Sequence, residues 1–170
     1  MRIYLVGFMG CGKSTVGREL ASTLDWDFLD LDREIERRSG HTIPEIFERE
    51  GEAGFRLRET TALAETRHRV RTILATGGGA FTRQENVDLI RRSGVSVWLD
   101  PDFPTLVARL RKSVRKRPLF QSEEQLRELW QSRLPWYGKA SLRIRITPED
   151  HAVSVSGKIV ERLKESPCAT

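Results

Sequence analysis

Short apolar stretches and longer stretches of mixed polarity alternate along the chain. Residues 2–6, 28–32, 70–75 and 95–99 are short and mostly apolar, which is typical of buried strands. Residues 142–146 alternate apolar and basic side chains, as a strand with one polar face does. The pattern therefore predicts five strands, the second of which ends in acidic residues.

Helices are predicted between these strands. Capping-box sequences of the form Ser/Thr-x-x-Glu/Gln predict helix starts at Thr42, Thr82 and Ser122. Elsewhere apolar residues at helical spacing, or a capping acid at Asp102, indicate the same structure. The predicted helices cover residues 13–24, 42 onward, 53–69, 82–92, 102 to about 109, 122–137 and 152–164. Strands separated by helices indicate a single α/β domain over residues 1–170, with a mostly parallel sheet.

Composition excludes several classes of protein. Of 170 residues, 38% are hydrophobic and 31% are charged, enough for one core and a polar surface, so a disordered chain is excluded. No apolar run reaches the roughly 20 residues that a membrane span needs. The formal net charge is +5, which allows a nucleic acid, an anionic membrane surface or a phosphorylated small molecule as partner.

Cysteine usage points to a reducing compartment. The chain has two cysteines, Cys11 and Cys168, too few for the disulfide framework of a small secreted protein. The apolar run at residues 2–6 is too short for a signal peptide and leads directly into a glycine-rich motif. We therefore expect a cytoplasmic protein.

The glycine-rich motif carries the strongest chemical signal. Residues 7–14, GFMGCGKS, fit the phosphate-binding pattern G-x-x-x-x-G-K-[ST], directly after a predicted strand and before a predicted helix. Glycines let backbone N–H groups turn toward phosphate oxygens, and the positive end of the helix faces the anion. Lys13 is expected to reach the β- and γ-phosphates and the Ser14 hydroxyl to hold Mg²⁺. The motif predicts nucleotide binding.

Two acids end the second predicted strand, where α/β sheets place their ligands. Asp30 and Asp32 are two residues apart, so on a strand their carboxylates point to the same side. One would then support Mg²⁺ while the other accepts a hydrogen bond from a substrate hydroxyl. The alternative is a helix start, with Asp32 capping residues 33–38. The pattern favours neither interpretation.

Two further segments suggest what lies beside the nucleotide. Residues 77–79 are three consecutive glycines, which allow a ligand to approach the backbone closely, although a flexible loop is the alternative. Residues 109–117 contain six basic side chains and no acid, followed by Pro118. A solvated face and a nucleic-acid contact are alternatives there, but the run lacks aromatic residues for base stacking. A lid that brings an arginine onto the transferred phosphate fits better beside a phosphate loop.

The order and spacing of these motifs resemble the shikimate kinase family nearly end to end. The residues that carry the resemblance are 7–15, 28–32, Ile46, Phe47, Gly51, Glu52, Phe55, Arg56, Glu59, 77–79, 117–119, Arg133 and Tyr137. The resemblance implies a three-layer P-loop NTPase fold of the nucleoside-monophosphate-kinase type with a five-stranded parallel sheet. It also implies ATP-dependent phosphorylation of the 3-hydroxyl of shikimate, giving shikimate 3-phosphate and ADP on the route to aromatic amino acids. The substrate-binding segment would be about 32–60 and the lid about 110–122.

The same resemblance implies roles for individual residues. Lys13, Asp32 and Arg117 would be catalytic, and Ser14 with Asp30 would hold Mg²⁺. Residues implied to bind the nucleotide are Gly10, Cys11, Gly12, Lys13, Ser14, Thr15 and Arg117. Residues implied to bind shikimate are Asp32, Arg56, Glu59, Gly77, Gly78, Gly79 and Arg133. Arginine suits this task because its guanidinium donates two parallel hydrogen bonds to a carboxylate.

Some positions depart from the family pattern, among them Leu110 and Lys139, which stands where the family often has an acid, and other functions remain as alternatives. The arginine expected to stack on adenine falls on Leu110, so Arg109 or Arg111 would have to serve. A gluconate-type kinase on the same fold, an ATP-binding module without turnover and a nucleic-acid-binding protein are the alternatives. We expect ATP or ADP and shikimate as ligands, no nucleic acid, no membrane, and a monomer.

Overall fold

A five-stranded parallel sheet forms the centre of the computed structural model, which describes residues 1–112 and 122–165. The sheet order is β2-β3-β1-β4-β5, and every paired strand is parallel to its neighbour. The strands are β1 Arg2–Val6, β2 Asp27–Asp30, β3 Thr72–Ala75, β4 Val95–Pro101 and β5 Leu142–Ile146. This confirms the predicted α/β class and the parallel sheet.

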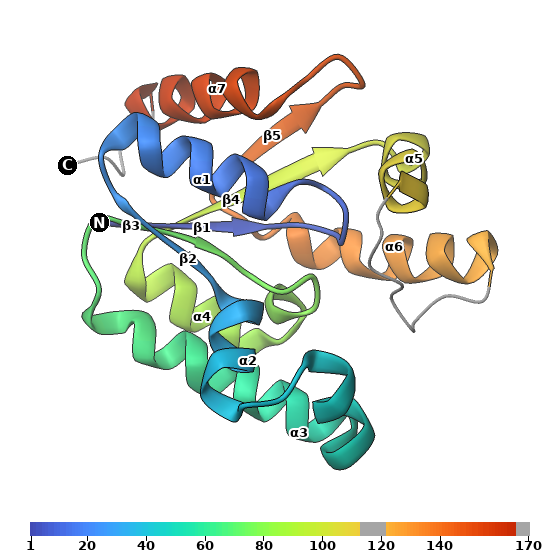
Figure 1. The fold of residues 1–170 in the computed structure, drawn as a ribbon. Helices are drawn as coiled ribbons and strands as arrows, with labels where there is room; N and C mark the ends of the chain where they lie inside the picture. Colours follow the sequence, from blue (N-terminus) through green and yellow to red (C-terminus); the bar gives the residue numbers. More distant parts are fainter. Residues whose placement is uncertain (113–121, 166–170) are drawn as a thin grey trace.

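Helices cover both faces of the sheet. Within the described residues the α-helices are α1 Lys13–Leu24, α2 Leu31–Ser39, α3 Ile43–Glu65, α4 Gln84–Ser93, α5 Phe103–Lys112, α6 Glu123–Tyr137 and α7 Ala152–Glu165, with short 3₁₀ helices η1 Thr66–His68 and η2 Ala80–Thr82. Helices α1 and α7 lie on one face, and α3 and α4 lie on the other (Figure 1). None of the helices in the described part of the chain is long and apolar enough to cross a membrane.

The central strand β1 marks where a ligand site is expected. Its residues Ile3–Val6 are fully buried, because β3 and β4 flank the strand and helices cover both faces. From β1 the chain moves to β2 on one side, whereas β4 and β5 lie on the other side. Such a reversal opens a crevice beyond the carboxyl ends of the strands. In Figure 1 these ends point toward α5 and α6.

The second strand is shorter than predicted, which changes the geometry of its two acids. Strand β2 ends at Asp30, and Leu31 already belongs to α2. Asp30 is the N-cap residue of that helix, because its Oδ1 accepts a hydrogen bond from the Arg33 amide at 3.4 Å. The prediction of a strand over residues 28–32 with both carboxylates on one side was therefore wrong. A helix does start here, but Asp30 caps it rather than Asp32.

Helix starts were predicted with mixed success. The helix starts at Thr42 and Ser122 are confirmed, with a full capping box at Thr42 and a hydrogen bond from the Gln125 amide to Ser122 Oγ at 3.2 Å. Asp102 Oδ1 caps α5 by accepting from the Thr105 amide at 2.8 Å. The box predicted at Thr82 was wrong. Helix α4 begins at Gln84, and the Thr82 hydroxyl donates backward to the Gly79 carbonyl at 2.7 Å. A threonine beside a turn can bond the backbone on either side, so the motif alone does not decide.

Other boundaries also differ from prediction. The helix expected over residues 53–69 is the second part of α3, which starts at Ile43 and continues through a kink at Gly51, where φ is 67°. The strand expected over 70–75 begins only at Thr72. Of the lid expected over about 110–122, residues 113–121, with Arg117, lie outside the described residues, as does Cys168.

Candidate active site

The phosphate loop connects β1 to α1 at the carboxyl edge of the sheet. Gly12 precedes the helix with φ 102°, a left-handed conformation that favours glycine. Within the described residues, no side chain caps the amino end of α1, so its first N–H groups are available to an anion. Gly7 is needed for space, since a Cβ there would lie 2.7 Å from the Leu99 carbonyl oxygen.

Lys13 lies folded across the loop. Its Nζ donates to the carbonyl oxygens of Gly7 at 2.8 Å and Phe8 at 2.9 Å. These bonds hold the ammonium group over the loop, where phosphate oxygens would be bound. The Cys11 side chain is fully buried and its Sγ lies 3.7 Å from Lys13 Nζ.

A hydroxyl and a carboxylate meet beside the loop. Ser14 Oγ, on the first turn of α1, donates to Asp30 Oδ2 at 2.5 Å. Both groups offer oxygen atoms, the ligands that Mg²⁺ prefers. No cluster of three or more His, Cys, Asp or Glu suited to a metal occurs in the described residues. A few protein oxygens fit Mg²⁺, which usually takes its other ligands from phosphates and water.

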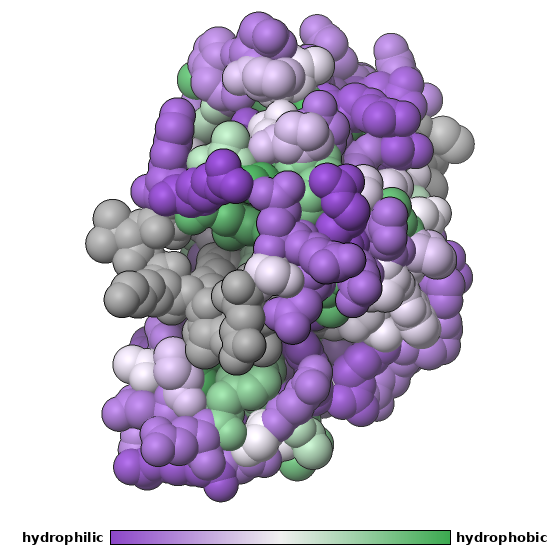
Figure 2. Space-filling model, turned by 90° about the vertical axis from the view of Figure 1, so that its right-hand side faces the viewer, coloured by the Kyte–Doolittle hydropathy of each residue, from purple (hydrophilic) through white to green (hydrophobic). Residues whose placement is uncertain are grey.

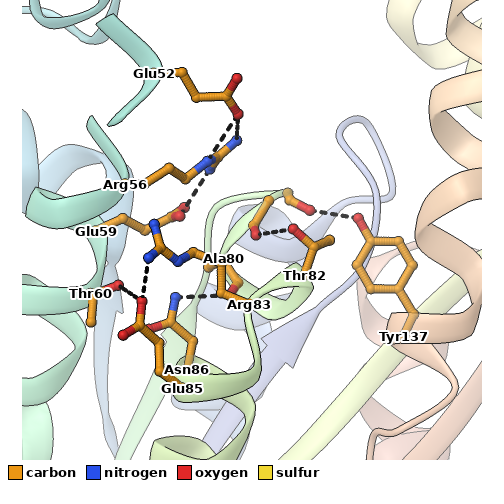
Figure 3. A network of polar contacts seen from close by, with 12 residues as sticks. Glu52, Arg56, Glu59, Thr60, Ala80, Thr82, Arg83, Glu85, Asn86 and Tyr137 are labelled. Carbon is orange, nitrogen blue, oxygen red and sulfur yellow. Dashed lines mark hydrogen bonds and ion pairs between the residues drawn. The ribbon is translucent and has the colours of Figure 1, made fainter. Parts of the chain in front are cut away.

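Arg56 and Glu59 form a buried ion pair on α3. Arg56 Nη1 donates to Glu59 Oε2 at 2.9 Å, while its Nε and Nη2 donate to Glu52 Oε1 at 3.3 and 3.2 Å (Figure 3). Glu59 is fully buried, and its second oxygen, Oε1, has no hydrogen-bond partner among the described residues. The guanidinium is thus fixed on two sides by carboxylates.

Burial and neighbouring charges perturb Glu59. Burial raises its pKa to about 7, although Arg56 and Arg133 oppose the rise and Asp32 adds to it. Asp32 is close by, because a Cβ on Gly77 would overlap Glu59 Oε1 and lie 2.9 Å from Asp32 Oδ1. Perturbed carboxyls beside a cleft are typical of functional sites.

The three consecutive glycines lie between two arginines. A Cβ on Gly79 would overlap the Arg56 guanidinium, and one on Gly78 would lie 3.4 Å from Arg133 Nη1. Arg133 comes from α6, and its guanidinium lies 5.5 Å from the centroid of the Phe8 ring. Close approach of side chains to this backbone therefore explains the glycines. The structure brings two guanidinium groups and two carboxylates together at this loop.

A separate cavity of about 320 Å³ adjoins the phosphate loop on the other side. Its lining includes Gly12, Thr15, Arg109 and the connection between β5 and α7. Arg109 Nη1 donates to the Cys11 carbonyl at 3.1 Å, whereas Arg111 pairs with Glu123 at 3.0 Å. Of the two arginines left open by sequence, Arg109 is the one at this cavity. Sequence reasoning assigned nothing to residues 147–151, which carry no motif.

The face that carries these groups is mainly hydrophilic. Figure 2 shows the side of the molecule toward which the strands point in Figure 1, and on its coloured surface the apolar side chains gather only in small patches. A phosphate loop, a hydroxyl–carboxylate pair and two arginines beside a buried carboxyl suit phosphoryl transfer to a small anionic acceptor. The fold and site define a P-loop kinase.

Comparison with known proteins identifies the family. The shikimate kinase family model matches residues 9–164. A shikimate kinase of Synechococcus sp. (strain CC9902) is 47% identical over 150 residues, covering 86% of this chain and 78% of the relative. The shikimate kinase from Acinetobacter baumannii in complex with shikimate has a TM-score of 0.90 at 43% identity, covering 96% of this chain and 93% of that one. The chain belongs to the shikimate kinase family.

Family membership confirms the predicted enzyme class. The protein is a kinase that uses ATP to phosphorylate shikimate, in the pathway to aromatic amino acids. The gluconate-type kinase and the ATP-binding module without turnover are thereby set aside. A deoxyadenosine kinase from M. mycoides, with a TM-score of 0.65 at 14% identity and coverage of 96% and 100%, shares the fold alone.

Proposed function

We propose that the chain transfers the γ-phosphoryl group of ATP to the 3-hydroxyl of shikimate at the glycine loop, which we define as residues 77–80. The observation that carries this proposal is the convergence of Arg56 and Arg133 on that loop, next to the phosphate loop. Shikimate is a carboxylate, and two guanidinium groups suit its acid. We also propose that residues 1–170 form one domain, with the phosphate loop at 7–15, the acceptor segment at about 32–60 and the lid at about 110–122.

On the acceptor side, the arginines orient the substrate and Asp32 handles the proton. Arg56 and Arg133 bind the carboxylate, and Glu59 fixes the direction of Arg56 through its 2.9 Å hydrogen bond. Asp32 accepts the proton of the attacking hydroxyl, as a general base near the P-loop edge would. The rings of Phe47 and Phe55, with centroids 4.7 Å apart, form an apolar wall.

On the nucleotide side, backbone groups and cations bind the phosphates. The N–H groups of residues 10–15 surround the phosphate oxygens, and Lys13 exchanges its bonds to the Gly7 and Phe8 carbonyls for bonds to phosphate. Arg117 neutralises charge on the transferred group, as a lid arginine does. The 320 Å³ cavity beside Arg109 accommodates the base.

Ser14 and Asp30 would hold Mg²⁺. When bound, the ion neutralises phosphate charge and orients the phosphates. The Ser14–Asp30 hydrogen bond supports this assignment because it already brings two oxygen ligands together. Replacing Asp30 by Asn is expected to raise the Mg²⁺ concentration needed for half-maximal rate. Calorimetric titration should show that the variant binds ATP less tightly in the presence of Mg²⁺ and normally in its absence.

The role of Asp32 gives the sharpest test. Asp32→Asn should lower turnover at least about a thousandfold, in line with loss of a general base and its charge, while ATP still binds. ADP release with and without shikimate measures the first, and calorimetry measures the second. Asp27→Asn, at the exposed start of β2, is the matched control and should change neither. An active Asp32→Asn enzyme would refute the assignment.

We further infer a monomeric, cytoplasmic enzyme that does not bind nucleic acid. The described elements assemble the acceptor and nucleotide sites from one chain, which supports a monomer. Light scattering across a concentration series checks the mass. Oligonucleotide binding that falls with rising salt would contradict the last inference.

A further inference from the structure

Three successive carbonyls of the glycine loop accept hydrogen bonds from side chains. The donor–acceptor pairs are Tyr137 Oη to Gly78 O at 2.6 Å, Thr82 Oγ1 to Gly79 O at 2.7 Å, and Asn86 Nδ2 to Ala80 O at 2.9 Å. The donors come from α6, η2 and α4, which surround the loop (Figure 3). A loop that lacks side chains of its own at 77–79 is thus fixed by its neighbours.

The bond from Tyr137 is deeply buried. Tyr137 is 1% exposed, and its ring packs against Trp98 with centroids 6.0 Å apart. Burial raises the pKa of Tyr137, so its hydroxyl stays a donor at every pH where the enzyme is studied. Losing a buried donor leaves the carbonyl without its partner, which is costly. The buried hydrogen bond from Tyr137 therefore keeps the Gly78 carbonyl in one position.

Both arginines lie against this loop. A Cβ added at Gly79 would overlap the Arg56 guanidinium, and one added at Gly78 would lie 3.4 Å from Arg133 Nη1. Arg133 and Tyr137 are four residues apart on α6, so they share one face of that helix. One helix therefore supplies a guanidinium to the acceptor site and a hydroxyl to the backbone beside it. A shift of the loop would move both guanidinium groups.

We propose that Tyr137 is a positioning residue for the acceptor, and that with Thr82 and Asn86 it fixes the glycine loop against which Arg56 and Arg133 lie. The proposal rests on the proposed function, because it assumes that these arginines bind the carboxylate of shikimate. In this proposal Tyr137 acts through the backbone of Gly78 and through its side-chain contact with Arg133.

Tyr137→Phe removes the hydroxyl and keeps the ring. We expect KM for shikimate to rise about five- to tenfold, as loss of one buried hydrogen bond would give, with KM for ATP unchanged. The matched control is Tyr4→Phe, since the Tyr4 hydroxyl on β1 is also buried but has no hydrogen-bond partner among the described residues. Steady-state kinetics with each substrate varied should show no change in either KM for the control.

A second variant keeps the test decisive if Tyr137→Phe folds poorly. Thr82→Val is close to isosteric and removes the bond to Gly79, so it should raise KM for shikimate in the same direction. Unchanged KM for shikimate in whichever of the two variants fold would overturn the proposal. Arg133→Lys distinguishes failure of the positioning role of Tyr137 from failure of the proposed carboxylate site. If it raises KM for shikimate while Tyr137→Phe does not, only the positioning role fails; if it has no effect, the carboxylate site itself is wrong.

Discussion

At residue 79 the missing side chain makes room for a guanidinium. The backbone there has φ −97°, which alanine adopts without strain, so Gly79→Ala acts through space alone. The added methyl should displace Arg56 and raise KM for shikimate about 10- to 100-fold, the range for losing a charged hydrogen bond. KM for ATP should not change. Gly157→Ala, on α7 with open space around it, is the control.

The ionisation of Glu59 should couple pH to stability. Its pKa is about 7 in the folded protein against 4.5 ordinarily, so between these values the folded state binds more protons than the unfolded state. The free energy of unfolding should therefore fall as pH rises through this window, by up to about 1.4 kcal/mol per pH unit. Glu59→Gln should lack this contribution. Urea unfolding of both proteins from pH 5 to 8 measures it, and identical slopes would refute it.

The sequence predicts the position of a single residue best where a motif assigns that residue type one role. The structure brings Lys13 to the phosphate loop, as its motif predicted, and places Arg56 beside residues 77–79, an arrangement that only the family resemblance implied. The strand expected to run to Asp32 ends two residues earlier, because the Asp30 side chain caps α2. Arg109 could not be chosen over Arg111 without the fold, since only the direction of α5 tells them apart.

The connection between β5 and α7 depends on one carboxylate. Asp150 accepts hydrogen bonds from the Thr147 amide at 2.9 Å, Ser154 Oγ at 3.0 Å and Lys158 Nζ at 2.7 Å. Its side chain is 7% exposed. These bonds fix residues 147–151, and His151 and Asp150 itself line the cavity assigned to the base.

Asp150→Asn should lower the free energy of unfolding by about 1–3 kcal/mol at pH 7, because charge-assisted bonds are lost. Burial alone would raise the pKa of Asp150, but its bonds to Lys158, Thr147 and Ser154 outweigh burial and lower it. The stabilisation is thus complete above the ordinary value of 3.8 and declines as pH falls below it. Urea unfolding should therefore show a smaller difference in the free energy of unfolding between the wild type and Asp150→Asn at pH 3 than at pH 7. The exposed Asp25→Asn is the control.

Helix starts were predicted well where the capping side chain forms its hydrogen bond with the helix that follows it. The boxes at Thr42 and Ser122 start helices, whereas Thr82 bonds backward to Gly79 and leaves α4 to begin at Gln84. The identical local pattern thus has two outcomes, and contact with the glycine loop decides between them.

At the scale of the whole molecule, the two ligand sites should stabilise the fold separately. Shikimate at about 100 times its Kd should add about 2.7 kcal/mol to the free energy of unfolding, and ADP at the same multiple should add the same. Gly79→Ala, tested at the shikimate concentration that saturates the wild type, should lose much of the first increase and keep the second. Thermal unfolding with each ligand measures both. Loss of the ADP effect would mean that the sites are not separate.

The hydrophobic pattern does not predict the order of the strands in the sheet. Periodicity gives five strands and their approximate bounds, but the order β2-β3-β1-β4-β5 depends on how helices pack between them. The same limit explains why residues 147–151 received no role from sequence, since they reach the phosphate loop only after β5 takes the far edge of the sheet.

The strand order also means that the proposed acceptor and nucleotide sites are formed largely by different segments of the chain. Apart from α6, the proposed acceptor site draws on one continuous stretch, from Asp32 to Thr82, while the proposed nucleotide site draws on residues 7–15, on Arg109 and on residues 146–155. Insertion or recombination within the first stretch can change which acceptor is bound and leave the nucleotide-binding residues unchanged. Helix α6 is the exception, because Arg133 and Tyr137 reach across to the glycine loop. Evolution of a new acceptor must therefore alter that helix too, or keep a carboxylate in the substrate.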